Sequence, residues 1–286
     1  MTLQGHTNGV LSLAELLNGD LASGSVDSSI KIWNVQDGSL IRTLNGHANG
    51  VLSLAVLQNG NLASGSYDNS IIIWNPTNGS LLRKLTGHAS YIHALAVLPN
   101  GYLASGSADS YIKIWNTNNG SLIRSLRYTT GVHYVYSLAV LQNGFLASGS
   151  DYSPIIIYNT DSGSYINRLT GHSNWVISLA LLQNGYLASG SNDRTIKIWN
   201  ADTGTLNKTI TGHNSYVYSL AVLQNGLLAS GGFGEIRIYN ATDSSLFKAF
   251  TAHTDVVNSL IVLRNGLLAS ASDDRTVKIW NVAALK

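Results

Sequence analysis

The stretch Leu187-Ala-Ser-Gly-Ser-Asn-Asp-Arg-Thr-Ile-Lys-Ile-Trp199-Asn200 decides the fold, because close copies of it recur along the whole chain. Residues 187–191 and 195–199 alternate in side-chain character with a period of two, which predicts two β-strands. The polar residues between them, 192–194, predict a tight turn. The other copies occupy residues 21–34, 62–75, 103–116, 146–159, 228–240 and 268–281. The chain therefore consists of seven repeats of about 41 residues.

Each repeat contains two further strands. Asn184-Gly185 lies between two apolar segments of the fifth repeat, and every other repeat has an Asn-Gly pair at the same place. This pair is a strong hairpin signal because both residues tolerate positive φ. A turn at 202–204 and a last strand at 205–210 complete a four-stranded antiparallel meander. Since one such unit cannot bury both of its faces, neighbouring repeats must stack.

Two motifs connect the repeat to a known family. Gly171-His172 precedes the first strand of the fifth repeat, and Trp199-Asn200 ends its third strand. On these motifs the chain resembles the WD40-repeat family, whose third strand usually ends in Trp-Asp, and the resemblance covers essentially all 286 residues. It implies an all-β fold, a seven-bladed β-propeller of four-stranded antiparallel blades, with residues 1–286 forming a single domain.

The resemblance also predicts how the ring closes. In WD40 propellers an N-terminal strand typically completes the last blade. Here only residues 2–4 precede Gly5-His6 in the place of that strand, and only five residues follow Asn281. We therefore expect the seventh blade to be closed by a short outer strand, with a weak seam at this edge.

The resemblance implies a buried hydrogen-bond relay in each blade. In the family it joins the His of Gly-His, a strand Ser, the turn Asp and the Trp. By position these are His172, Ser189, Asp193 and Trp199 in blade five. The corresponding sets are His6, Ser23, Asp27 and Trp33; His47, Ser64, Asp68 and Trp74; His88, Ser105, Asp109 and Trp115; and His253, Ser270, Asp274 and Trp280. A hydrolytic triad is rejected, because the set recurs once per blade and its serine lacks a Gly-x-Ser-x-Gly elbow.

Two blades depart from this pattern. Blade four has Gly131, Tyr152 and Tyr158 where the His, Asp and Trp are expected, and it carries a two-residue insertion near Tyr128-Thr129. Blade six keeps its His and Ser but has lost the Asp, and Tyr239 replaces the Trp. These two blades have either drifted or adapted to a partner.

The function is expected where the repeats differ. In the family, the residues flanking the buried aliphatic of the first strand, and the residue before the turn Asp, project onto the narrow face around the central channel, where partners usually bind. In blades one, two and seven these are Gly9, Leu11, Val26, Gly50, Leu52, Val256, Asn258 and Asp273. The candidate partner-binding residues are Tyr67, Tyr91, His93, Tyr134, Tyr136, Trp175, Ile177, Tyr216, Tyr218 and Phe233. We name this set, which lies mainly on blades three to six, the aromatic arc.

Aromatic side chains are enriched at binding hot spots, so the aromatic arc predicts a non-enzymatic scaffold that binds a protein or peptide. One alternative is that the rings only pack on one another and shield the channel. Another is a lectin-like propeller that binds a glycan or small ligand by stacking rings on sugars. Repeated equivalent pockets would favour the glycan alternative.

Composition restricts the other function classes. The chain has no cysteine, 11% charged residues, a net charge of +2 and no basic run, so a nucleic-acid partner is not expected. No apolar run approaches a membrane span, and the first residues contain no apolar signal region, so we expect a cytoplasmic monomer without membrane association. His93 and His133 lie outside the relay without a carboxylate cluster, so neither a metal site nor a cofactor is expected. A periodic basic series is expected to form a solvated rim; it consists of Arg42, Arg83, Arg124, Arg168, Lys208 and Lys248.

Overall fold

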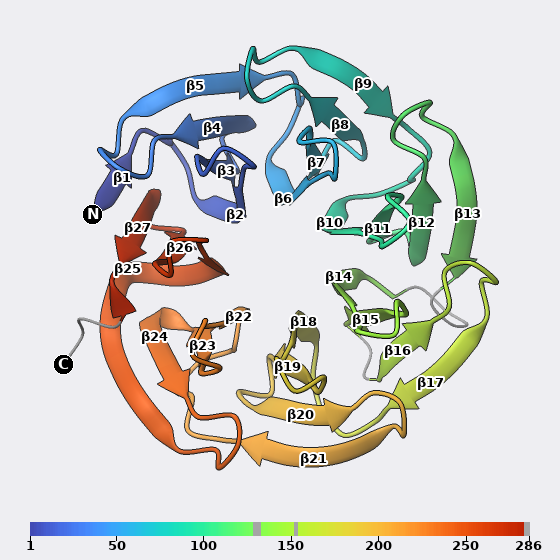
Figure 1. The fold of residues 1–286 in the computed structure, drawn as a ribbon, viewed down its shortest axis with the longest axis vertical. Coiled ribbons are helices and arrows are strands. Elements are labelled where there is room, and N and C mark those ends of the chain that lie inside the picture. Colours follow the sequence, from blue (N-terminus) through green and yellow to red (C-terminus); the bar gives the residue numbers. More distant parts are fainter. Residues whose placement is uncertain (128–132, 152–153, 283–286) are drawn as a thin grey trace.

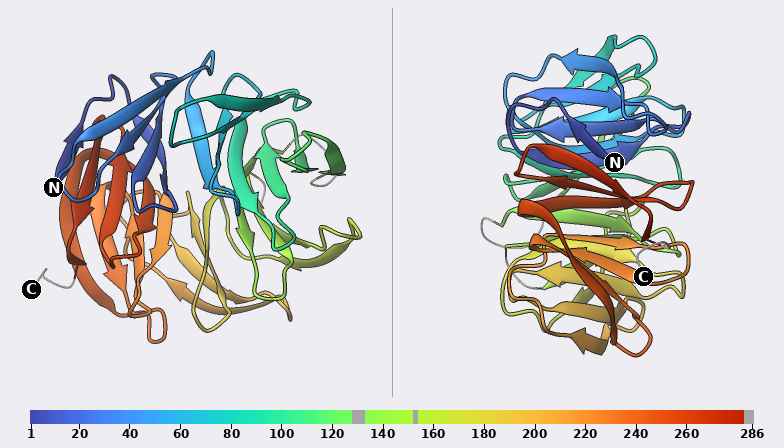
Figure 2. Two further views of the ribbon diagram at one scale, coloured as in Figure 1. Left: turned by 45° about the horizontal axis from the view of Figure 1, so that its top comes forward. Right: turned by 90° about the vertical axis from the view of Figure 1, so that its left-hand side faces the viewer.

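The computed structural model describes residues 1–127, 133–151 and 154–282. Their strands form a ring of seven blades around a central axis, with the first strand of each blade innermost and the last on the circumference (Figure 1). Seen from the side, the ring is a flat disc (Figure 2). The all-β seven-bladed fold expected from the repeats is confirmed.

Five blades are separate four-stranded antiparallel sheets. Blade one consists of β2 (Val10–Glu15), β3 (Leu21–Ser25), β4 (Ser29–Trp33) and β5 (Leu40–Asn45). Blade two consists of β6 (Val51–Val56), β7 (Leu62–Ser66), β8 (Ile71–Trp74) and β9 (Leu81–Leu85). Blade three consists of β10 (Ile92–Val97), β11 (Leu103–Ser107), β12 (Tyr111–Trp115) and β13 (Leu122–Arg127). Blade four consists of β14 (Val135–Val140), β15 (Leu146–Ser150), β16 (Ile155–Tyr158) and β17 (Tyr165–Leu169). Blade five consists of β18 (Val176–Leu181), β19 (Leu187–Ser191), β20 (Ile196–Asn200) and β21 (Thr205–Ile210).

Blades six and seven are joined into one seven-stranded sheet, which the repeat does not predict. Blade six contains β22 (Ser219–Val222), β23 (Leu228–Gly231) and β24 (Phe233–Tyr239), and blade seven contains β26 (Leu268–Ser272) and β27 (Thr276–Trp280). A single strand, β25 (Leu246–Val262), is the outer strand of the first and the inner strand of the second. Without the turn Asp, β24 starts early and Phe233 pairs with Val256, so the chain between the blades stays hydrogen-bonded in the sheet.

The N-terminal strand closes the ring as expected. β1 (Thr2–Gln4) pairs antiparallel with β27, and β1 and β27 lie side by side in Figure 1. Leu3 is buried in the core of blade seven, and the Ile279 N–H donates to the Met1 carbonyl. With three residues, β1 is shorter than the outer strand of any other blade. That the seam is weak remains a prediction.

The predicted relay is present in blades one, two, three, five and seven. In blade five, His172 Nδ1 lies 2.6 Å from Asp193 Oδ2, His172 Nε2 lies 2.7 Å from Ser189 Oγ, and Trp199 Nε1 donates to the same oxygen at 2.8 Å. The second carboxylate oxygen of Asp193 accepts from the Thr195 N–H, which holds Arg194 in a left-handed turn with φ of 67°. The Asp therefore fixes both the turn and the histidine ring.

Burial and hydrogen bonding act in opposite directions on the relay carboxyls. Burial disfavours the charge on Asp27, but hydrogen bonds from the Ser29 hydroxyl, the Thr7 N–H and His6 outweigh it and lower the pKa of Asp27 to about 2. Burial also lowers the pKa of His6, against the effect of its Asp partner. The ring is therefore neutral at pH 7 and the carboxylate is ionised, as the relay requires.

The two divergent blades keep only parts of the relay. The Tyr158 hydroxyl donates to the Arg127 carbonyl at 3.3 Å, whereas Gly131, Tyr152 and the insertion near residues 128–129 lie outside the described residues. In blade six, His213 Nε2 still meets Ser230 Oγ at 2.8 Å. The Tyr239 hydroxyl is buried and has no hydrogen-bond partner among the described residues.

The expectation of a solvated basic rim is wrong for its best-placed members. The Arg42 guanidinium donates to the Thr77 and Asn78 carbonyls in the turn that precedes the last strand of the next blade. Other members of the series make the equivalent bond to the next blade; they are Arg83, Arg124 and Lys208. In blade four the strand register places Asn167, and not Arg168, at this position, and its amide donates to the Ala201 carbonyl. The series therefore links neighbouring blades.

None of the described residues belongs to a helix long and apolar enough to cross a membrane.

Candidate functional site

The aromatic arc lies where the first strand of each blade begins, beside the turn between its second and third strands. Five of its side chains are 40–61% exposed, namely Tyr91, Tyr134, Trp175, Tyr216 and Phe233. The other five are half-buried, namely Tyr67, His93, Tyr136, Ile177 and Tyr218. Each of the ten side chains therefore keeps part of its surface open to solvent.

Six of the rings form one continuous cluster across blades two to five. Tyr67 and Tyr91 meet edge to face with ring centroids 4.8 Å apart. His93 contacts both tyrosines and lies 4.8 Å from Tyr136, centroid to centroid. Tyr136 then contacts Tyr134 and stacks on Trp175 at 5.3 Å and 18°. Such pairs are worth about 0.5–1.5 kcal/mol each beyond the area that they bury.

The remaining members are less tightly connected. Tyr216 and Tyr218 form a separate pair at 5.9 Å. Phe233 is the most exposed ring, at 61%, and among the described residues no ring contact joins it or Ile177 to the cluster. The structure therefore brings together six of the ten predicted residues directly and places the other four in blades five and six.

In the first strand of each blade, the residue that directly follows the buried aliphatic residue faces a central channel. Leu11, His93 and Ile177 line it together with Tyr218 and Asn258, and its volume is about 320 Å³. The packing alternative is therefore partly right, since the half-buried rings contact one another beside this channel. This alternative does not account for the five exposed rings, because their outer surfaces are open to solvent.

In blades one and two a glycine stands directly before the buried aliphatic of the first strand, and the space for a side chain there is already filled. A Cβ on Gly9 would lie 2.4 Å from Asp273 Oδ1, and one on Gly50 would lie 3.0 Å from the Val26 Cα and 3.1 Å from the Tyr67 ring. The residue before the turn Asp of the preceding blade fills this space. In blade three the equivalent neighbours, Tyr67 and Tyr91, are two tyrosines in ring contact, and the arc begins with this pair.

His93 of the aromatic arc and His133, which lies outside it, have different surroundings. His133 Nδ1 lies 3.6 Å from Asp151 Oδ1, whereas His93 is enclosed by tyrosines. Among the described residues no group of three or more His, Asp or Glu is placed to hold a metal ion. Burial lowers the pKa of His93 to about 4, so its ring is neutral at pH 7.

His93 should make folding sensitive to acid. Because its folded pKa of about 4 lies below the unfolded value of 6.5, the unfolded chain binds more protons between these values, and stability falls as the pH drops through this window. We expect His93→Leu to lose less stability than the wild type between pH 7 and 4.5, by on the order of 2 kcal/mol. Leu11 and Leu52 occupy the same position in other blades, so the framework accepts leucine there.

Urea denaturation at several pH values tests this effect. Burial and Arg237 also lower the pKa of His213 to about 4, so the stability of the variant should still decrease somewhat as the pH falls. Parallel pH profiles for the wild type and His93→Leu would contradict the assignment.

Sequence reasoning missed a second set of exposed apolar side chains. They start the outer strands on the circumference and are 41–62% exposed; they are Leu40, Ile41, Leu81, Leu82, Leu122, Ile123, Tyr165, Ile166, Leu206, Leu246 and Phe247. Their spacing repeats once per blade, which could have revealed them. Because they encircle the ring, they do not single out one side as the aromatic arc does.

Comparison with known families agrees with the geometry. A search of curated protein sequences found no match to the chain. A profile described as WD40, WD domain, G-beta repeat, matches more than half of the chain, at residues 1–34, 38–75, 79–116, 163–200, 204–240 and 244–281. The unmatched residues 117–162 include the first three strands of the fourth repeat, whose framework Trp is replaced by Tyr158. With six matched repeats and a seven-bladed ring closed by its N-terminal strand, the chain belongs to the WD40-repeat family.

Proposed function

We propose that this protein is a non-enzymatic interaction scaffold that binds a peptide or protein segment on the aromatic arc. WD40 repeats generally mediate protein–protein interactions. The observation that carries the proposal for this chain is the cluster of six rings in mutual contact, in which Tyr91, Tyr134 and Trp175 are each at least 40% exposed. Rings held by their neighbours lose little entropy on binding, which is typical of hot-spot residues.

The geometry of the cluster favours a peptide over a sugar at this site. A sugar stacks on the flat face of a ring, but Tyr136 and Trp175 each lose one face to their mutual stacking, and the Tyr67 and Tyr91 rings meet edge to face. Ring edges and the grooves between rings suit the side chains of a peptide better. We therefore place the lectin-like alternative second for the aromatic arc.

A peptide-display selection against the folded protein tests the proposal. We expect Tyr91→Ala/Tyr134→Ala/Trp175→Ala to weaken the selected peptide by at least about 100-fold, since each hot-spot truncation costs about 2 kcal/mol or more. The dissociation constants are measured by calorimetry, after thermal melts show that the variant is folded.

The matched control removes equally exposed apolar side chains elsewhere. Leu82→Ala/Ile123→Ala/Ile166→Ala truncates residues that are 41–48% exposed on the outer strands. The proposal requires this control to bind like the wild type. Equal loss in both variants, or no selected peptide that depends on the three rings, would overturn it.

A further inference from the structure

A second recurrent feature lies on the opposite face of the disc. β10 runs from the arc residues Tyr91 and His93 to the Asn100-Gly101 turn, so the Asn-Gly turns lie on the face away from the arc. Between adjacent blades on this face are cavities of about 420 Å³ (blades one and two), 190 Å³ (two and three), 340 Å³ (four and five) and 540 Å³ (six and seven). Each is enclosed by the Asn-Gly turns of both blades and by the turn after the third strand of the second blade.

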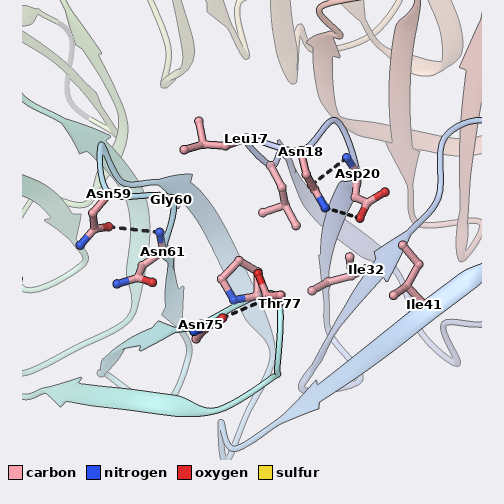
Figure 3. A pocket seen from close by; sticks show the side chains of 12 residues that line it. Leu17, Asn18, Asp20, Ile32, Ile41, Asn59, Gly60, Asn61, Asn75 and Thr77 are labelled. Carbon is pink, nitrogen blue, oxygen red and sulfur yellow. Dashed lines mark hydrogen bonds between the residues drawn. The ribbon is translucent and has the colours of Figure 1, made fainter.

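The cavity between blades one and two has both polar and apolar lining residues. Figure 3 shows Asn59, Asn61 and Asn75 along one side, and Ile32 and Ile41 along the other, with Asn18 and Asp20 above the two isoleucines. Backbone N–H groups donate to Oδ1 of Asn59 and Asn75 at 3.1 and 3.0 Å, which fixes both side chains. Their amide nitrogens have no partner among the described residues and remain available as donors.

Two of the cavities also contain a carboxylate held by an asparagine. Asn18 Nδ2 donates to Asp20 Oδ2 at 2.7 Å in the first cavity. In the cavity between blades four and five, Asn143 Nδ2 donates to Asp202 Oδ1 at 2.8 Å. In both pairs the carboxylate keeps a second oxygen, and that oxygen can accept from a ligand hydroxyl. The two pairs are formed by different turns, yet each cavity has the same arrangement of an asparagine amide bonded to a carboxylate.

The charge of the lining selects a neutral ligand. Among the described residues that line these two cavities there is one carboxylate each and no Lys, Arg or His, which disfavours phosphates and other anions. Fixed amide donors, a carboxylate acceptor and an apolar wall match the hydroxyls and the C–H face of a sugar. Tyr186 supplies a ring beside the second cavity, at the position that Asn61 occupies in the first, where Ile32 and Ile41 are the apolar residues. Both volumes lie within the range of small-ligand sites.

We propose that the cavities between blades one and two and between blades four and five each bind a neutral sugar. The two sites are independent of the aromatic arc. Two sites on one rigid disc would also engage a multivalent glycan surface with much higher avidity than either site alone.

The test uses glucose, galactose, mannose, fucose and N-acetylglucosamine in saturation-transfer NMR, followed by calorimetry, with glycerol as the polyol control and sialic acid as the anionic comparison. We expect at least one neutral sugar to bind with millimolar affinity and a stoichiometry of two. We expect Asp20→Leu and Asp202→Thr each to reduce the stoichiometry to one, and the double variant to lose binding. Leu227 and Thr77 occupy the equivalent positions in other blades, so the framework accepts both substitutions.

Two controls make the outcomes distinct. Asp161→Thr removes a carboxylate at the Asp202 position of blade four that also accepts from an asparagine, but it lines none of these cavities, so binding must persist. The variant Tyr91→Ala/Tyr134→Ala/Trp175→Ala must also keep full sugar binding. No neutral sugar binding above glycerol, binding that survives the double variant, or binding lost with the aromatic rings would each overturn the proposal.

Discussion

Ser189→Ala is expected to lower the free energy of unfolding by about 3–5 kcal/mol, although it removes a single oxygen. Ser189 is completely buried, and its hydroxyl lies between His172 Nε2 and the Trp199 indole N–H. Since the Asp193 carboxylate can only accept, His172 Nδ1 carries a proton, and Nε2 can then accept from the serine hydroxyl. Alanine leaves a buried donor and a buried acceptor unpaired, at about 1–3 kcal/mol each in addition to the lost bonds.

The divergent blades supply matched controls for this variant. Ser230→Ala removes the partner of His213 and a bond to the Arg237 carbonyl but no bond from an indole, because Tyr239 replaces the Trp, and should cost about 1–3 kcal/mol. Among the described residues Ser148→Ala removes only a bond to the Ile156 carbonyl, and it should cost less than about 1 kcal/mol. Urea denaturation should therefore show the largest loss of stability for Ser189→Ala, a smaller loss for Ser230→Ala and the smallest for Ser148→Ala. Equal costs would mean that the relay contributes nothing beyond the packing of the serine.

Replacing β1 should have the largest effect of any change considered. The triple variant Thr2→Gly/Leu3→Ser/Gln4→Gly removes a side chain that is 1% exposed and weakens the pairing that protects the β27 edge. We expect a loss of about 5 kcal/mol or more, comparable with the whole stability of many domains. The uncovered strand can then pair with other chains, so size-exclusion chromatography should show oligomers where the wild type gives a single smaller species.

A single substitution tests whether the seam is weaker than the other outer strands. Leu3→Ala and Leu44→Ala remove the same atoms from equivalent, equally buried positions, and each should cost about 2–4 kcal/mol. Hydrogen exchange distinguishes them. Leu3→Ala should release the amides of β27 before the rest of the molecule, whereas Leu44→Ala should leave β4 protected until global unfolding. If β27 stays as protected as β4 in both variants, the seam is not a weak point.

The sequence by itself determined the features that lie within one repeat. The period of two in 187–199, the Asn-Gly turns and the need to stack meanders are local signals, and they led to the right blades and the right ring. The relay could be assigned by position because its four residues belong to one blade. The closing strand was expected from the resemblance to WD40 propellers, and its shortness from the few residues before His6.

Only the tertiary structure decided what happens between blades. The link from Arg42 to the next blade, the strand β25 shared by two blades, and the hydrogen bond from Asn143 to Asp202 depend on how neighbouring sheets are set against each other. The same is true of Gly9, whose lack of a side chain is explained by Asp273, 264 positions away in the sequence. The periodicity of one repeat determines on which face of the sheet each side chain lies. The angle and spacing between neighbouring sheets determine which residues those side chains contact.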